Sequence, residues 1–389
     1  MGRLDSSVAH SKSEDSFTAG KEVSSSIKDD IGSPELVFVF SGSNRTDEDL
    51  LRGINQEIED AVVAGCSTGG EISSVEGIQR NSVVMAGFSG EDLEVGRGVG
   101  KKISRDPREA GRTASRRLHE ELGEADERIY YTVFSTSMTG NSSEVMRGVQ
   151  EVIGREAEGC GGLAGDDWKM EESYVIDGDE LLSDAVSVVG IRTGSRIGHG
   201  VRHGLEPSRQ RHVVTNSSGN IVHELDGRPA AEIYRELFGD EIKRPEFLMT
   251  KPLGMELSDG SMRLRNPLSL NGDSIAFAGE VTEGETVTVM DSPRESIIEA
   301  ARESARSAVE AAGNPDEDEI SAVILHDCVC RWNCLEIYEM RQKEIEAVRE
   351  VVGEDTPVIG WYTYGEIALP SEECGVHNQT MVTQVFTEE

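Results

Sequence analysis

Two stretches of this sequence repeat one pattern, Gly65-Cys66-Ser67-Thr68-Gly69-Gly70-Glu71-Ile72 and Gly360-Trp361-Tyr362-Thr363-Tyr364-Gly365-Glu366-Ile367, which agree as G-x-x-T-x-G-E-I. Each follows an apolar, β-branched run that is typical of a buried strand. Glycine tolerates positive φ and carries no Cβ, so the backbone of such a turn can approach a ligand closely. One copy is explained by turn geometry alone, whereas two copies indicate a duplicated architecture. We expect the turns to be equivalent, each joining a buried strand to a following antiparallel one.

The order of elements around these turns is found three times along the chain. Buried strands are predicted at 36–40, 130–134 and 322–325, each followed by an amphipathic helix, a second strand and a Gly-rich turn. In the middle unit this turn covers 159–167. The sequence therefore predicts an α/β fold with two domains, built from repeated strand–helix–strand–Gly turn–strand units with mixed sheets.

Composition and length suggest how the chain is divided. Its 389 residues fit two domains better than one. Residues 1–15 are polar and Ser-rich, which predicts a disordered tail. We place the first domain at 16–238 and the second at 239–389, with the boundary after a predicted helix that ends at Phe238.

The chain is strongly acidic, with 73 Asp and Glu against 38 Lys and Arg and a formal net charge of −35. The acidic residues are spread along the chain rather than gathered in one tail. Such a surface suits concentrated salt, where the charges are screened, and this predicts a halophilic source. It also argues against binding nucleic acid through a broad electrostatic footprint.

Two absences in the sequence predict where the protein resides. No apolar stretch approaches 18 residues, so we expect no membrane insertion. The N-terminus lacks the apolar core of a secretory signal, so we expect a cytoplasmic protein. Its six cysteines are then predicted to be thiols rather than disulfides.

Polar side chains follow the predicted strands, at the sheet edge where α/β proteins bind ligands. An Arg among carboxylates and hydroxyls suits a zwitterion, because Arg grips a carboxylate and an acid accepts from an ammonium group. We expect Arg331, Thr363 and Glu366 to share one pocket with Cys328 at its wall; a structural ion pair at Arg331 is the alternative. The candidate ligand-binding residues are Thr68, Glu71, Asp166, Cys328, Arg331, Thr363 and Glu366.

Histidines and cysteines offer alternatives to a ligand pocket. His326, Cys328, Cys330 and Cys334 lie close in sequence, but they lack paired C-x₂-C spacing, so buried structural thiols are favoured over a metal site. Cys328 could form a nucleophilic pair with His199 or His377. His199 and His203 could ligate haem or a metal. We assign no catalytic residue, metal or cofactor, and keep haem as the alternative cofactor.

The motifs in their order resemble the FIST sensory proteins, with an N-terminal and a C-terminal FIST domain. The resemblance is carried by the strand at 36–40, the turns at 65–72 and 161–167, His199-Gly200, 225–230, 328–331, 359–367 and 377–380. It covers nearly the whole chain after residue 15. It implies a signal-input module for small ligands such as amino acids; some relatives resemble haem-binding nitric oxide sensors that act on histidine kinases.

The function predicted from these observations is a stand-alone cytosolic sensor of a small polar ligand, with an amino acid as one candidate. Its expected partner is a separate signalling protein, such as a histidine kinase. The competing hypotheses are a haem-based nitric oxide sensor and an enzyme that depends on Cys328 or a metal.

Overall fold

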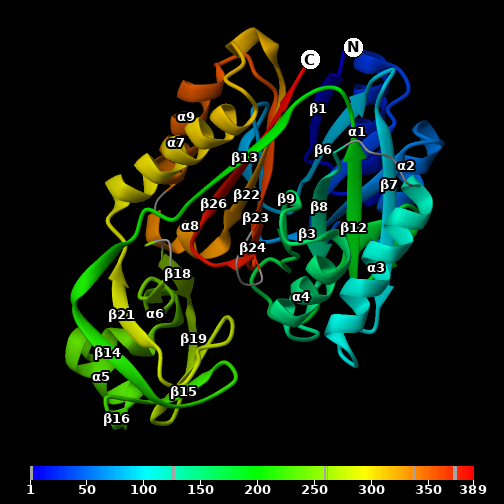
Figure 1. Cartoon of the computed structure of the whole chain (residues 1–389). Helices are drawn as coiled ribbons and strands as arrows, with labels where there is room; N and C mark the ends of the chain where they lie inside the picture. The colour runs from blue at the N-terminus through cyan, green and yellow to red at the C-terminus, as the bar shows by residue number, and fades with distance from the viewer. Residues whose placement is uncertain (1–2, 124–127, 258–259, 261, 336–337, 371–374) are drawn as a thin grey trace.

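The computed structural model describes residues 3–123, 128–257, 260, 262–335, 338–370 and 375–389. It shows a mixed α/β protein in which three sheets form a body and a smaller lobe lies beside it (Figure 1). The predicted fold class, α/β with several mixed sheets, is therefore confirmed.

The three sheets of the body share one strand plan. In each, a central strand pairs in parallel with the next long strand of its unit and antiparallel with the unit's last strand. The first sheet is ordered β1 (Asp5–Ser11), β6 (Val83–Ser89), β2 (Leu36–Gly42), β3 (Val62–Thr68), β10 (Val175–Asp177), β11 (Glu180–Leu182). The second is ordered β7 (Glu94–Lys101), β12 (Ala185–Arg192), β8 (Tyr130–Ser135), β9 (Glu158–Leu163), β24 (Glu366–Leu369), β25 (Val376–His377). The third is ordered β13 (Ile197–Arg202), β26 (Met381–Thr387), β22 (Ile320–Cys328), β23 (Val358–Thr363), β4 (Glu71–Ser73), β5 (Gly77–Gln79).

After each Gly-rich turn the chain leaves its own sheet for the next one. Strand β4 pairs antiparallel with β23, β24 with β9, and β10 with β3, so the sheets are joined in a closed ring. The two turns were expected to join a buried strand to a following antiparallel one; the strands that follow them, β4 and β24, pair antiparallel with a strand of another unit. The turn residues pair with a neighbouring turn instead of closing a hairpin: Gly69 donates to Tyr362 O and Tyr362 donates to Gly70 O, each at 2.8 Å.

Helices cover the outer faces of the three sheets (Figure 1). Four of them begin at an Asp or Asn whose side chain accepts from a backbone N–H of the first turn, as a helix N-terminus requires: Asp15, Asp47, Asp106 and Asn141. The helices of the body are α1 (Ser16–Ile31), α2 (Glu48–Glu57), α3 (Pro107–Leu122), α4 (Ser142–Ile153), α7 (Arg294–Ala311), α8 (Val329–Leu335) and α9 (Tyr338–Val352), with the 3₁₀ turn η2 (Glu317–Glu319).

The inner faces of the sheets meet in one aromatic core. Phe40 stacks on Trp361 with ring centroids 5.2 Å apart, and Phe134 packs edge-on against Phe38 at 5.7 Å. These rings come from all three sheets and are fully buried. Burial of large aromatic rings contributes strongly to stability, so this core holds the body together.

Part of the segment predicted as a disordered tail, residues 1–15, forms a strand. Residues Asp5–Ser11 form β1, which pairs antiparallel with β6 from Asp5 opposite Ser89 to Ser11 opposite Val83. The polar side chains of this strand are hydrogen-bonded within the fold, as in the 2.6 Å hydrogen bond from the buried Ser7 to Asp30 of the neighbouring helix α1. Composition alone therefore misrepresented an edge strand as a tail.

The lobe is inserted between β13 and α7, and it has a hydrophobic cluster of its own around Val222, Tyr234 and Phe277. The boundary predicted between 238 and 239 falls inside this lobe, between a helix and a 3₁₀ turn that pack together. Its elements are β14 (Glu206–Ser218), β15 (Ile221–Leu225), β16 (Arg228–Pro229), α5 (Ala230–Phe238), η1 (Gly239–Lys243), α6 (Pro245–Leu248), β17 (Leu253–Glu256), β18 (Met262–Arg265), β19 (Pro267–Asn271), β20 (Ser274–Phe277) and β21 (Thr286–Asp291).

Candidate functional site

The three Gly-rich turns meet and bond to one another through their backbones. The ring of contacts consists of Gly69 N–H to Tyr362 O at 2.8 Å, Gly165 N–H to Ser67 O at 2.9 Å, and Tyr364 N–H to Leu163 O at 2.9 Å. The register pairs Val39 with Gly65, Val133 with Gly161 and Leu325 with Gly360, so the bonded residues occupy matching positions in the three units. This ring fixes the carboxyl ends of the central strands relative to one another.

The first Thr–Glu pair is buried and its hydrogen bonds are internal. Thr68 donates to Glu71 Oε1 and accepts from Gly70 N–H at 3.2 Å. Glu71 Oε2 accepts from the backbone N–H of Ser82 at 2.9 Å and from its hydroxyl at 2.7 Å. Burial raises the pKa of Glu71 to about 7, despite these donors.

The second pair repeats this arrangement. Thr363 donates to Glu366 Oε1 at 2.6 Å and accepts from Gly365 N–H at 3.3 Å. Glu366 Oε2 accepts from the N–H and the hydroxyl of Thr380 at 3.0 and 2.8 Å, and burial again raises the pKa to about 7. The two turns thus share one local hydrogen-bonding pattern. Both pairs bond within the protein and tie each turn to the strand after it.

The middle turn departs from this pattern at Asp166. Its carboxylate accepts from the backbone N–H groups of Met170, Glu171 and Glu172 at 2.7–3.2 Å and from the Tyr364 hydroxyl at 2.6 Å. It therefore holds a loop that the other turns lack. Within this loop Asp167, Trp168 and Met170 have φ of 56°, 67° and 55°. Positive φ is costly for such side chains, and strained loops of this kind concentrate at functional sites.

Arg331 is fully buried, and its guanidinium lies in an ion cluster of the protein itself. Its Nε lies 3.0 Å from Asp327 Oδ1 and 2.9 Å from Glu344 Oε1, and both carboxylates are fully buried. It also donates to the carbonyl oxygens of His203 at 2.8 Å and Ile297 at 3.0 Å. The structural ion pair, which the sequence left as the alternative, is the arrangement found.

Cys328, predicted at the wall of a ligand pocket, and His326, considered with the nearby cysteines for a metal site, make internal contacts instead. Cys328 is buried and lies beside Thr363 in the parallel register, and burial raises the pKa of its thiol well above the usual range. The His326 ring points into the aromatic core, where it accepts from Trp361 Nε1 at 2.9 Å. Among the described residues no group of three or more His, Cys, Asp or Glu is arranged to hold a metal. The five described cysteines are free thiols, as predicted.

The histidines considered for catalysis or haem make other contacts. His199 packs edge-on against Tyr130 at 5.9 Å, and His203 Nδ1 accepts from Leu205 N–H at 2.9 Å. The Cys–His pair found, Cys160 Sγ and His326 Nε2 at 3.4 Å, was not predicted. Burial raises the Cys160 pKa to about 12 and lowers the His326 pKa to about 4. Both groups are therefore neutral, which gives no thiolate nucleophile.

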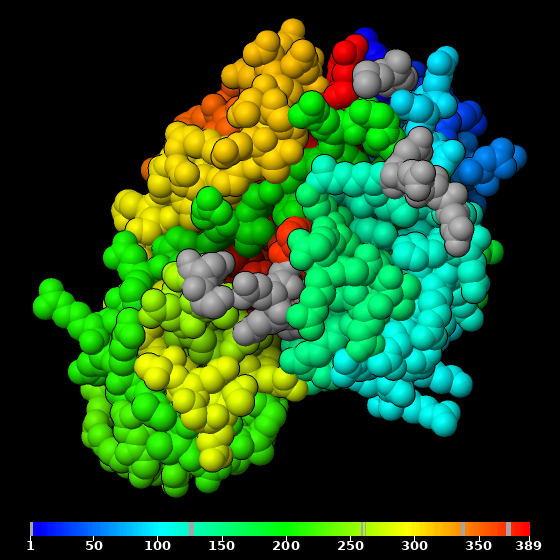
Figure 2. Space-filling view, in the orientation of Figure 1, coloured from blue at the N-terminus to red at the C-terminus, as the bar shows by residue number. Residues whose placement is uncertain are grey.

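A cavity of about 530 Å³ lies between the body and the lobe, above the ring of turns. The surface is hollowed between lobe and body (Figure 2). None of the seven predicted ligand-binding residues is among the described residues that line this cavity, but Leu163, Val329 and Tyr364, each within three positions of a predicted residue, are. The body supplies Ser137, Met138, Gly140, Asn141, Ser142, Leu163, Trp168, Met170, Val329, Cys330, Tyr364 and Asn378; the lobe supplies Gly219, Asn220, Met249, Asn266, Leu268, Phe277, Ala278, Gly279 and Glu280.

The strained loop of the middle turn forms part of this cavity. Trp168 and Met170 line it, and the Trp168 ring lies 6.5 Å from that of Tyr364. Tyr364 OH accepts from Trp168 N–H at 2.8 Å while it donates to Asp166. Asp166, predicted as a ligand contact, thus positions the loop that forms the wall. No sequence signal marked the lobe residues, since they reach the cavity only through tertiary packing.

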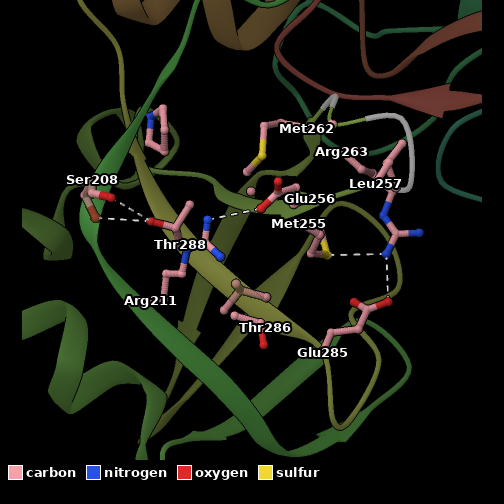
Figure 3. A pocket seen from close by; sticks show the side chains of 14 residues that line it. Ser208, Arg211, Met255, Glu256, Leu257, Met262, Arg263, Glu285, Thr286 and Thr288 are labelled. Carbon is pink, nitrogen blue, oxygen red and sulfur yellow. Dashed lines mark hydrogen bonds and ion pairs between the residues drawn. The ribbon is translucent and has the colours of Figure 1, made fainter.

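A second pocket of about 490 Å³ lies within the lobe, on β14, β17, β18 and β21 (Figure 3). Its charged side chains pair with one another: Arg211 with Glu256 at 3.1 Å and Arg263 with Glu285 at 2.9 Å. Thr288 donates to Ser208 O at 3.2 Å across the irregular β14–β21 pairing. Because the charged side chains of this pocket are paired with one another, we favour the cavity between body and lobe as the ligand site.

None of the helices in the described ranges has both the length and the apolarity needed to cross a lipid bilayer.

Comparison with known proteins gives matches over most of the chain. A family model described as the FIST N domain matches residues 35–228, and one described as the FIST C domain matches 230–369. An uncharacterized protein of Methanocaldococcus jannaschii is 26% identical over an alignment of 421 residues. The alignment covers 97% of this chain and 78% of the relative. Among solved structures, a cyanuric acid hydrolase is 10% identical with a TM-score of 0.42, covering 100% of both chains. The cyanuric acid hydrolase from A. caulinodans is 9% identical with a TM-score of 0.43, covering 99% of this chain and 100% of its own.

Proposed function

The chain belongs to the FIST family, a family of sensory domains, and we propose that it is a sensor whose small-molecule ligand binds in the cavity between the body and the lobe. The observation that carries the proposal is that residues of both the body and the lobe line this cavity. Its floor comes from turns that are fixed by the ring of backbone hydrogen bonds, and its other wall comes from the inserted lobe.

The same arrangement supports a way to transmit a signal. Among the described residues, polar contacts between the two parts near the cavity include Asn141 Nδ2 to Glu280 at 2.7 Å and Gln379 Nε2 to Met249 O at 2.9 Å. A ligand seated between body and lobe contacts both, so its affinity depends on their relative position. Differential affinity for two positions is what shifts a conformational equilibrium. A signalling protein such as a histidine kinase would then read the position of the lobe.

A thermal-shift screen of small metabolites, amino acids included, tests the proposal. In molar KCl, a compound that binds the folded state raises the melting temperature by mass action. Ala278→Leu narrows the cavity and should abolish the shift. Ala276→Leu makes the same change in the same part of the lobe, at a residue outside the described cavity lining, and should retain it. A hit whose shift is equal in wild type and Ala278→Leu would place the site elsewhere.

A further inference from the structure

One polar atom of the cavity lacks a hydrogen-bond partner. Asn266 lines the cavity and is only 1% exposed, yet its Oδ1 has no partner in the structure. Its Nδ2 donates to Met249 O at 3.2 Å, which fixes the amide so that oxygen is the open atom. A buried acceptor without a donor is unfavourable, so a bound ligand that donates a hydrogen bond would remove this cost.

The charges around the cavity select against anions. No Lys, Arg or His occurs among the described residues that line it, and Glu280 is the charged residue among them. An anion would therefore be desolvated without an opposite charge, within a chain of net charge −35. A cation is not strongly favoured either, since Glu280 already accepts from Asn141 and lies 3.5 Å from Arg147.

Most of the remaining wall is apolar or aromatic. Trp168 and Tyr364 pack together at one side, and Phe277 and Met249 lie at the lobe side. Two other amides of the lining have partners for their oxygens: Asn378 Oδ1 accepts from Asn266 N–H at 3.5 Å, and Asn141 Oδ1 accepts from Ser143 N–H at 3.0 Å. The open acceptor of Asn266 therefore stands out against a largely apolar surface.

Resting on the function proposed above, we infer that the ligand is an uncharged small molecule with an apolar or aromatic body and an N–H or O–H donor that bonds to Asn266 Oδ1. This inference excludes a free amino acid from the cavity, because its carboxylate would find no cationic partner among the described lining residues. It therefore narrows the ligand class that the sequence suggested.

Four probes that share a phenyl ring and differ in one polar substituent test the inference: benzamide, methyl benzoate, benzoate and benzylamine. Titration by ligand-observed NMR in molar KCl gives their relative affinities for the full chain. Benzamide, which is neutral and donates, should bind tightest. Methyl benzoate, which is neutral and only accepts, should bind about tenfold more weakly, since it leaves Asn266 unpaired. Tighter binding of benzoate or benzylamine would leave the site in place and overturn the inferred ligand class.

Asn266→Ala separates the hydrogen bond from general binding. It should weaken the binding of benzamide by about threefold to tenfold and leave the binding of methyl benzoate unchanged. Met249 O keeps its bond from Gln379, so the substitution orphans no carbonyl there. Asn220→Ala is the matched control, an asparagine of the same cavity whose loss should affect both neutral probes equally. If Asn266→Ala weakens the binding of both probes equally, Asn266 does not supply the hydrogen bond that selects the ligand.

The wild-type ranking stands by itself if a variant fails to fold. If benzamide and methyl benzoate bind equally to wild type, Asn266 does not select the ligand and the inference is wrong. If none of the four probes binds at millimolar concentration, while the metabolite screen yields hits that Ala278→Leu abolishes, the inferred class is wrong and the proposed function stands. If neither experiment detects binding, both fail together.

Discussion

The hydroxyl of Tyr364 donates a 2.6 Å hydrogen bond to the carboxylate of Asp166, and this bond joins the last Gly-rich turn to the loop of the middle one. The same hydroxyl accepts from Trp168 N–H at 2.8 Å. One side chain of the third unit thus holds the strained loop that forms a wall of the cavity. The matching positions of the other units are Gly69 and Gly165, so this support has no counterpart there.

Tyr364→Phe should lower the free energy of unfolding by about 1–2 kcal/mol, because it leaves a buried carboxylate oxygen and a backbone N–H without their partner. It should also speed hydrogen exchange of the amides at 168–172 more than elsewhere. Urea denaturation and exchange measured by mass spectrometry give both quantities. Tyr174→Phe is the control, since its hydroxyl bonds to the exposed Glu172, and it should change stability by less than about 0.5 kcal/mol. Equal effects in the two variants would mean that Tyr364 does not hold the loop.

The buried Glu71 and Glu366 make a prediction about pH. Burial raises the pKa of each from 4.5 to about 7, so between these values the folded state binds more protons than the unfolded state. Stability from these groups is then fully present below about pH 4.5 and falls as the pH rises toward 7, by roughly 3 kcal/mol per carboxyl.

Glu71→Gln and Glu366→Gln remove this titration while keeping the shape of the side chain. The stability of wild type relative to each variant should therefore decrease from pH 4.5 to 7 and level off above it. Denaturation series of wild type, both single variants and the double variant measure the difference directly. A difference that does not vary with pH would show that the two carboxyls do not titrate in this range.

The buried ion cluster predicts unequal effects for its members. Arg331→Met leaves Asp327 and Glu344 buried without a cation and should destabilise by roughly 3–5 kcal/mol. Burial, and then the negative charge of Glu344, raise the pKa of Asp327 well above its usual range, so the cluster tolerates loss of the Asp327 charge better than loss of the Arg331 cation. Asp327→Asn should therefore cost less than about 1 kcal/mol. The reverse order in denaturant titrations would contradict this assignment of charge.

Low salt should destabilise the protein, because the net charge of −35 repels itself when it is not screened. The melting temperature in millimolar KCl is expected to lie several degrees below that in molar KCl. Molar sorbitol at low salt is the control for excluded-volume effects and should not restore stability to the same degree. A melting temperature that is independent of salt would remove the halophilic interpretation of the composition.

The sequence was informative where structure is local. The G-x-x-T-x-G-E-I pattern predicted two equivalent turns because Thr68 and Glu71 bond within four residues, as do Thr363 and Glu366. The pairing of β4 with β23 of the third sheet was not predictable. The partner of so short a strand depends on which sheet edge lies beside it in the folded protein, not on its own sequence.

The candidate site was harder to predict for the same reason. Arg331 was expected a few residues beyond a strand end and lies in α8, directly after β22. Its partner Glu344 lies on α9, and the two side chains form a buried ion pair that no local pattern indicates. Asn266 belongs to a lobe inserted into the third unit, and it reaches the cavity only because the lobe folds back on the ring of turns. Neither residue carries a local pattern that distinguishes it from other polar residues.

The inserted lobe should be removable. Glu206 and Asp291 are cross-strand partners, so the chain enters and leaves the lobe at adjacent points. Joining Leu205 to Ser292 through a Gly-Ser link should leave the ring of turns and the aromatic core intact, because their residues lie outside 206–291. The shortened chain should unfold cooperatively, at a lower temperature than wild type because Leu205 loses its contacts with Leu264 and Met290.

Removing the lobe also takes away one wall of the cavity, so benzamide should no longer bind to the shortened chain. Circular dichroism melts and the NMR titration measure the two effects separately. Residues 206–291 expressed alone are the complementary control, since their own hydrophobic cluster predicts a folded lobe that does not bind the probe. A shortened chain that does not fold would mean that the lobe is part of the body's folding unit. One that folds and still binds benzamide would place the ligand site within the body.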